Sequence, residues 1–422
     1  MSSGPALSRR LGTFDAVVIG LGSMIGAGVF ASFAPAAAAA GTGLLLGLAI
    51  AGVVAFCNAT ASAQLAAQYP TSGGTYIYGR ERLGPWPGFL AGWSFVIGKT
   101  ASCAAMAMVF AAYVAPAGWE KPVAMVGIAA LAAVNYRGVT RTAGLTRIIV
   151  AIVLLVLALV VVVGLTADTG SATSFGADLF VGGPYGILQS AGLLFFAFAG
   201  YARIATMGEE VKDPRRIIPR AIVTALVLVL ILYALIAATV LLVLGPERLA
   251  TATAPLVDVV GTAGADWAVP AVRVGAATAA LGALLALVAG VGRTALAMAR
   301  NGDLPTWLAA VHPTYRVPHH AEVALAVVVV TLVLAVDLRG AIVFSSFGVL
   351  LYYLIANVAA FTQTREHRRY GRPLQAVGAA GCLLLVLTLP PTSILVGVGV
   401  LVVGAAYRLL RLRRAAGDTT DG

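Results

Sequence analysis

Long apolar segments separated by short polar connections account for most of the 422-residue chain. A helix needs about 20 apolar residues to cross the ~30 Å hydrocarbon core of a bilayer. By this criterion the hydropathy pattern predicts about twelve spans, at roughly residues 14–40, 44–66, 86–114, 122–136, 148–167, 185–208, 220–244, 268–298, 321–337, 341–361, 374–389 and 393–410. We therefore predict an all-α integral membrane protein with about twelve transmembrane helices and no soluble domain between them.

The first predicted span carries a glycine-rich interruption. Gly22, Gly26 and Gly28 lie within the segment 22–30, and each glycine costs about 0.8–1.0 kcal/mol relative to alanine inside a helix. Unwound backbone at membrane depth is tolerated only where it is buried in protein or lines a cavity. The interruption therefore indicates a binding site, although Gly22 and Gly26 also form a small-xxx-small pair that is typical of simple helix packing.

A second interruption falls in the sixth predicted span, where Gly200 stands among the aromatic residues of the segment 195–201. Spans 1 and 6 each open a block of five spans. Interrupted helices at matching positions of two blocks indicate an inverted repeat with a substrate site between the halves. This interpretation divides the chain roughly into an N-terminal tail 1–13, a first repeat 14–167, a second repeat 185–361, peripheral spans 374–410 and a C-terminal tail 411–422.

Composition and charge fit a membrane protein. Hydrophobic residues make up 60% of the chain and charged residues only 11%. If the N-terminus is placed in the cytoplasm, most of the 28 Lys and Arg residues fall on cytoplasmic connections. This bias predicts a multi-pass protein of the cytoplasmic membrane with both termini inside the cell. It explains the net charge of +11 without a nucleic-acid partner, and the basic segment 408–414 is expected to meet anionic lipids.

Three blocks in this order resemble the amino acid–polyamine–organocation (APC) family of permeases. The first is the interruption at 22–30, and the second is the aromatic segment 195–201, which continues into 209–214 and Ile218-Pro219. The third is the segment 297–305, which leads to His312-Pro313 and Pro318. The resemblance covers essentially the whole chain. It implies a LeuT-like fold of five plus five inverted spans, with helices 1 and 6 broken, and transport of amino acids or related amines.

The resemblance also implies a substrate site at the two interruptions. The family's carboxylate-binding amides fall on Ile25, Gly26, Ala27 and Gly28. This placement agrees with the preference of anions for the N-terminal end of a half-helix. The family's amino-group site falls on carbonyls near Gly22, Phe196, Ala197 and Ala199. Phe198 and Tyr201 match aromatic gates that close over substrate, or are ordinary packing residues.

Ionisable residues inside a membrane are functional candidates by default. Lys99 lies nearest the middle of its span and is either a proton-labile group or a structural cation satisfied by carbonyls. Arg203 follows the second interruption and does not deprotonate, so we expect an anchor or a gate. Glu209 and Glu210 either pair with nearby arginines at an inner gate or belong to a charged loop that serves topology alone.

Departures from the family pattern bear on energetics. Some members carry a lysine in span 5 that replaces a sodium ion, and Val153 occupies the matching position. The segment 281–292 of span 8 contains neither Ser nor Thr, so a sodium site built on side-chain oxygens lacks its ligands. We therefore expect proton coupling or exchange of one amino acid for another, rather than sodium coupling.

The expected substrate class follows from the absence of acidic residues near the middle of the predicted spans. All 17 acidic residues fall at span ends or in loops, so a cationic substrate side chain would lack a partner. We expect a neutral or small polar amino acid, with acidic ones admitted through Lys99 or Arg203. The spans carry no nucleophile–base pair and no metal or cofactor motif, so the expected function is secondary transport by alternating access and not catalysis. The alternatives are a related LeuT-like permease for a nucleobase or amine, and a non-transporting amino acid sensor.

Overall fold

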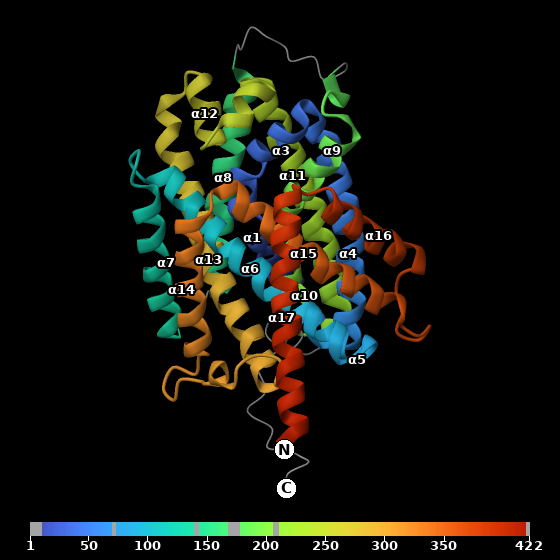
Figure 1. The fold of residues 1–422 in the computed structure, drawn as a ribbon. Coiled ribbons are helices and arrows are strands. Elements are labelled where there is room, and N and C mark those ends of the chain that lie inside the picture. Colours follow the sequence, from blue (N-terminus) through green and yellow to red (C-terminus); the bar gives the residue numbers. More distant parts are fainter. Residues whose placement is uncertain (1–10, 70–72, 139–142, 168–177, 206–210, 419–422) are drawn as a thin grey trace.

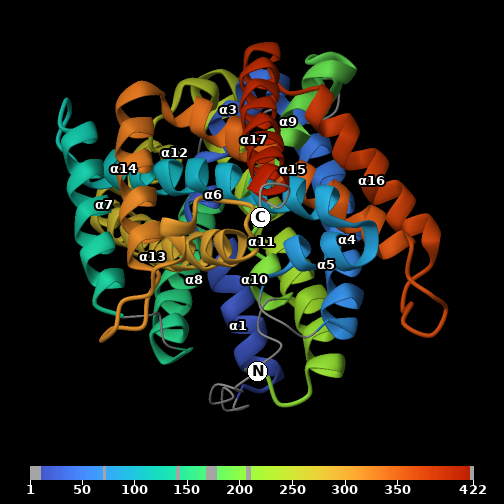
Figure 2. The same ribbon diagram turned by 60° about the horizontal axis from the view of Figure 1, so that its bottom comes forward.

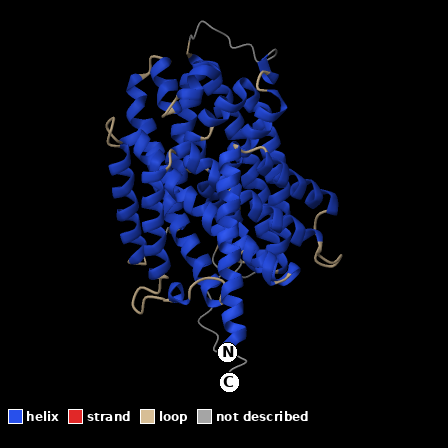
Figure 3. Ribbon diagram, viewed as in Figure 1, coloured by secondary structure: helices blue, strands red, loops and turns tan. Residues whose placement is uncertain are grey.

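The protein is a bundle of helices that run mostly along one common direction (Figures 1 and 3). The computed structural model describes residues 11–69, 73–138, 143–167, 178–205 and 211–418. Within these ranges the chain is helical apart from connecting loops and one isolated β-bridge between Leu11 and Val211. The expectation of a multi-pass, all-α membrane protein is confirmed.

The first half of the chain forms α1 (Thr13–Met24), α2 (Ala27–Ala31), α3 (Phe33–Ala40), α4 (Leu44–Gln68), α5 (Thr75–Leu83), α6 (Pro85–Val114), α7 (Glu120–Tyr136) and α8 (Ala143–Thr166). The second half forms α9 (Gly183–Phe198), α10 (Ala202–Ala205), α11 (Pro214–Thr251), α12 (Pro255–Thr262), α13 (Val269–Arg300), α14 (His319–Ala335), α15 (Leu338–Phe361), α16 (Arg372–Leu387) and α17 (Pro391–Asp418). Short 3₁₀ turns occupy Gly41–Gly43, Asp178–Phe180, Asp266–Ala268 and Thr306–Ala309.

These helices follow the predicted spans closely. In the part of the chain that the structure describes, eight helical segments are long and apolar enough to cross a membrane, and α9, α14 and α16 are shorter apolar helices. The count of twelve spans and the inverted repeat stay predictions. Two differences are local: α5 and α12 are helices within predicted connections, and α11 runs past the predicted end of span 7. At that end Gly245 takes a left-handed φ of 71° just before Pro246, so the helix changes direction there.

Both predicted interruptions are present in the backbone. The first helical segment is interrupted at Ile25 and Gly26, between α1 and α2. The sixth is interrupted at residues 199–201, between α9 and α10. Freed backbone groups need partners inside a membrane, so these two points are the places where a site can form.

The broken helices lie inside the bundle. Helix α6 packs against α13 and α15, while α4 packs against α9, α11 and α15. Figure 2 shows α7 and α14 on one side of the bundle and α16 on the other, with α1, α6 and α13 between them. Helix α17 contacts α6 and α15 and extends beyond the other helices at the end where α1 begins (Figure 1).

A buried carboxylate forms ion pairs that join α17 to the end of the bundle where α1 begins. Asp303, which follows α13 and is only 3% exposed, pairs with Arg80 of α5 at 2.9 Å and with Arg408 of α17 at 3.0 Å. Tyr76 donates a hydrogen bond of 2.8 Å to the same carboxylate. Burial and the adjacent carboxylate raise the pKa of Tyr76 to about 12, so its hydroxyl remains a donor at neutral pH. The Arg408 guanidinium also lies 4.8 Å from the Phe89 ring.

We predict that Asp303→Asn destabilises the fold. Removing the charge leaves the buried Arg408 without its counter-charge, and losing one partner of a buried pair costs about 3 kcal/mol or more. The apparent melting temperature in detergent should fall by several degrees. Asp266→Asn, at an exposed position, is the matched control and should leave it unchanged. Equal melting temperatures for both variants would contradict this role of Asp303.

Candidate substrate site

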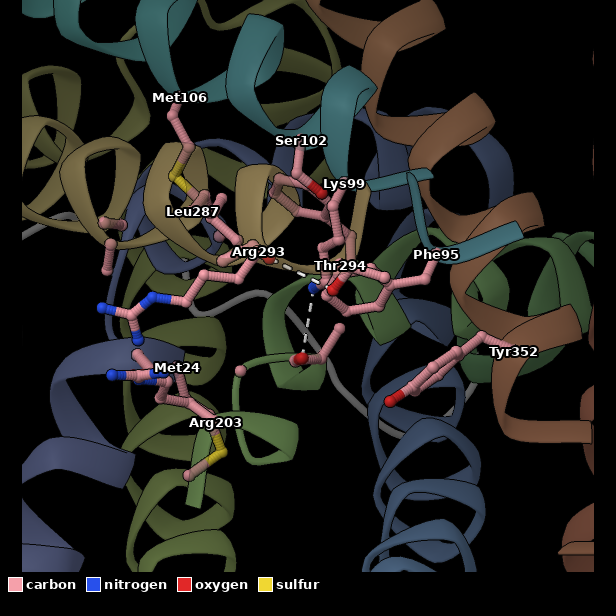
Figure 4. Close-up of a pocket in the computed structure, with 18 of the residues that line it drawn as sticks. Met24, Phe95, Lys99, Ser102, Met106, Arg203, Leu287, Arg293, Thr294 and Tyr352 are labelled. Carbon is pink, nitrogen blue, oxygen red and sulfur yellow. Dashed lines mark hydrogen bonds between the residues drawn. The ribbon is translucent and has the colours of Figure 1, made fainter. Parts of the chain in front are cut away.

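A cavity of about 280 Å³ lies where the two interruptions meet. Its wall combines the α1–α2 break, the α9–α10 break, one face of α6 and one face of α13, with Tyr352 of α15 closing one side (Figure 4). The lining also includes Gly73 before α5 and Arg300 at the end of α13. Helix α5 and the last turns of α13 lie toward the end of the bundle where α1 begins (Figure 1), so these two residues extend the lining toward that side.

The two interruptions pack directly against each other through glycines. A Cβ atom on Gly28 would lie 2.6 Å from the Ala197 Cα, and a Cβ atom on Gly200 would overlap the Ser23 carbonyl and approach the Met24 nitrogen to 2.6 Å. These distances are below any normal contact. A side chain at Gly28 or Gly200 would therefore push the two breaks apart, which explains why both positions carry glycine.

Tyr233 of α11 joins the two interruptions by hydrogen bonding. Its hydroxyl is fully buried and lies 2.7 Å from the Met24 carbonyl and 3.1 Å from the Ala197 carbonyl, so its single O–H is shared between these two acceptors. These carbonyls lie at the ends of α1 and α9, where the regular helical pattern stops. One side chain thus serves freed backbone groups of both broken helices.

Lys99 of α6 serves a third carbonyl. Its ammonium donates to the Ala199 carbonyl at 3.2 Å, and the side chain is only 6% exposed (Figure 4). The Tyr353 hydroxyl of α15 donates to the same carbonyl at 3.4 Å. The predicted cation in the middle of span 3 therefore meets the backbone of the second interruption, as its structural interpretation requires.

Further along α6, the same face reaches the first interruption. Ser102 and Met106 line the cavity together with Lys99, and the spacings of three and seven residues place all three on one helix face. The Met106 sulfur accepts a hydrogen bond of 3.4 Å from the Ala27 amide at the start of α2. The amide that the resemblance assigns to a substrate carboxylate therefore faces a weak acceptor in this conformation.

The contribution of α13 was not predicted from the sequence. Its lining residues recur at helical spacing, at Ala283, Ala286, Leu287, Gly290, Arg293, Thr294 and Ala297. Small residues on one face, followed by an arginine and a threonine, are the signal that could have identified this wall. Glu322 of α14 was also missed as a buried acid: it is 3% exposed, packs against Gly292 and acts electrostatically on Arg293.

The predicted binding residues divide into two groups. Gly28, Phe196, Ala197, Ala199, Lys99 and Arg203 line the cavity. Buried in the surrounding bundle are Gly22, Ile25, Gly26, Ala27, Phe198 and Tyr201. The two proposed gates are engaged in packing here, since the Phe198 ring lies 5.2 Å from Tyr233 and the Tyr201 ring stacks 5.0 Å from Tyr353. Glu209 and Glu210 lie outside the described residues.

Residues 15–418 match the amino acid permease family. The chain belongs to this family. This match confirms the resemblance that was inferred from the three sequence blocks. Membership of the family indicates that the permease is an amino acid transporter of the membrane.

Individual relatives cover nearly the full length of the permease. It is 58% identical over 420 residues to an uncharacterized transporter of Mycobacterium tuberculosis, spanning 99% of this chain and 94% of the relative. It is 28% identical over 387 residues to cationic amino acid transporter 7 of Arabidopsis thaliana, and the match covers 85% of this chain and 66% of the relative. It is 24% identical over 416 residues to a branched-chain amino acid permease of Bacillus subtilis, and the match covers 91% of this chain and 89% of the relative. These names differ in substrate class, so the site itself must indicate what this permease carries.

We predict that Tyr233→Phe weakens the contact between the two interruptions. The substitution removes the hydroxyl that the two carbonyls share and leaves the buried Ala197 carbonyl without this donor, at a cost of about 1–3 kcal/mol, while the ring packing is retained. The Met24 carbonyl keeps the Gly26 amide as a donor. The apparent melting temperature should fall. Tyr315→Phe is the matched control, because that tyrosine is 42% exposed. If both variants melt like the parent, the Tyr233 hydroxyl does not hold the breaks together.

Proposed function

We propose that this permease is a secondary transporter that moves amino acids across the cytoplasmic membrane by alternating access. The observation that carries the proposal is a cavity that both helix interruptions line. A site between two broken helices is accessible to each side in turn when one half of the bundle rocks against the other. Amino acids or related compounds are the substrates that kinship with the family favours.

Binding would use the freed backbone on both sides of the cavity. The α-carboxylate fits at the start of α2, where the amides of Ile25, Gly26, Ala27 and Gly28 carry the positive end of a half-helix. The amino group fits the carbonyls of Phe196 and Ala197, since a carbonyl oxygen can accept a second hydrogen bond. At the Ala199 carbonyl, which accepts from Lys99 and Tyr353, it would have to replace one of these donors. Substrate must draw the α2 amides away from their present contacts, such as the bond from Ala27 to Met106.

The structure corresponds to an inward-facing state under this proposal. The cavity extends to the end of the bundle where α1 begins, and the positive-inside bias places that end in the cytoplasm. Exchange or proton coupling is favoured over sodium coupling, because the stretch of α13 from Leu281 to Gly292 offers no side-chain hydroxyl as a ligand.

Counterflow in proteoliposomes tests the proposed function. Purified protein, loaded with one unlabelled amino acid and no ion gradient, should take up the same labelled amino acid against its concentration gradient. Liposomes without protein are the control. Absence of exchange with every amino acid, from protein that remains folded and monodisperse, would refute amino acid transport and favour a nucleobase or amine substrate, or a sensor.

The placement of the site makes a separate prediction for Gly28. In Gly28→Ala the new Cβ lies 2.6 Å from Ala197 Cα, so the breaks must separate and the α2 amides shift away from the substrate. We expect substrate affinity to fall at least about tenfold, a loss of about 1.4 kcal/mol. Gly399→Ala, where the added atom meets open space, is the matched control. Equal half-saturation concentrations for exchange in both variants would contradict the placement.

A further inference from the structure

The charged side chains that line the cavity, among the residues that the structure describes, are all basic. Lys99, Arg203, Arg293 and Arg300 contribute to the lining, which contains no Asp or Glu from the described ranges. Arg293 has Glu322 in its electrostatic neighbourhood, and Arg300 stands at the exposed end of α13. In Figure 4, Arg203 and Arg293 lie on the Met24 side of the cavity, away from Phe95 and Tyr352.

Lys99 is the charge that topology does not explain. Basic residues at the inner ends of spans follow from the positive-inside rule, but Lys99 sits near the midpoint of the 30-residue α6 and is 6% exposed. The ion pairs of the described residues join Arg80, Arg147 and Arg408 to carboxylates and do not include Lys99. A buried ammonium without a counter-charge is costly, so an anion that reaches it gains more than it would at a surface lysine.

The ammonium is also able to bind such an anion. It has three N–H donors, and among the contacts of the described residues it uses one, to the Ala199 carbonyl. Ser102, one turn along the same face, also lines the cavity, and its hydroxyl pairs with the Ser345 hydroxyl at 2.6 Å. Met106, at the first interruption, lies two turns from Lys99, about 10 Å along the helix axis. A substrate that reaches from the first interruption toward Lys99 presents its side chain, and not its α-carboxylate, to the ammonium.

We infer that the permease carries amino acids with a second carboxylate, of the aspartate and glutamate class, and that Lys99 binds the side-chain carboxylate. The inference rests on the proposed transport function and adds the substrate class and a specificity residue. It contrasts with a site for cationic side chains, which would meet four like charges in this lining and no acid from the described residues.

Isosteric pairs give the sharpest measurement. Counterflow with glutamate against glutamine, and aspartate against asparagine, compares substrates of nearly equal size that differ in one charge. We expect the acidic member of each pair to exchange at least about tenfold more efficiently, as for one charge-assisted hydrogen bond. Lysine and arginine should be the poorest substrates.

Variants assign the preference to Lys99. Lys99→Met should reduce the acid-to-amide ratio by roughly 10- to 100-fold, and Lys99→Arg should restore part of it, because a structural role alone would change both members of a pair equally. Lys121→Met is the matched control, since Lys121 is exposed and donates to the Leu334 carbonyl, away from the cavity. It should keep the parental ratio.

The outcomes separate the two proposals. Efficient exchange of neutral amino acids with no preference for acids would overturn the acidic substrate class and leave the transport function standing. No exchange of any amino acid would overturn the transport function itself. If Lys99→Met does not fold, the ratios for the parent and for Lys99→Arg still decide the substrate class, and an unchanged ratio in a folded Lys99→Met would remove Lys99 from the site.

Discussion

Backbone groups released by a broken helix have no water to bond to at membrane depth, and the organisation of this protein follows from that constraint. The α1–α2 and α9–α10 interruptions are placed against each other, so that glycines permit direct backbone contact. Donors from three neighbouring helices then reach buried carbonyls at the two interruptions: Tyr233 from α11, Lys99 from α6 and Tyr353 from α15. The central site is therefore held by polar side chains of the surrounding bundle.

The hydrogen bonds that stabilise the contact between the two interruptions also affect access to the cavity between them. Each donor bridges a broken helix to a neighbouring helix, so separating the breaks costs hydrogen bonds that only a substrate or a rearranged bundle can replace. A ligand can shift the population between two conformations only by as much as its affinity differs between them. A substrate that separates the breaks must therefore bind the separated conformation more tightly than the packed one. The ionic cluster around Asp303 lies at the end of the bundle toward which the cavity extends, where Asp303 joins α5 and α17.

The sequence predicted the features that are local. Apolar segment lengths identified the helices, and the glycines at 22–28 and at 200 located both interruptions. Contacts between distant segments were outside its reach: Tyr233 lies 209 residues from Met24, and Arg293 became a lining residue only through the packing of α13 against α6. For Phe198 and Tyr201 the sequence could not separate gating from packing, because an aromatic residue beside a break has the same local pattern in either role. Glu322 was taken for a span-end acid, yet packing against α13 buries it.

The Lys99 ammonium is a positive charge at the site, and it is covalently attached to the chain. A dissolved ion enters from one compartment and leaves into the other, and its gradient can do work through that passage. An ammonium that donates to the Ala199 carbonyl travels nowhere, since its nitrogen remains on α6 throughout the cycle. It can organise the second interruption permanently, but it can draw on an ion gradient only by gaining and losing a proton. Under the proposed exchange mechanism, the work of accumulating one amino acid would come from the outward flow of another.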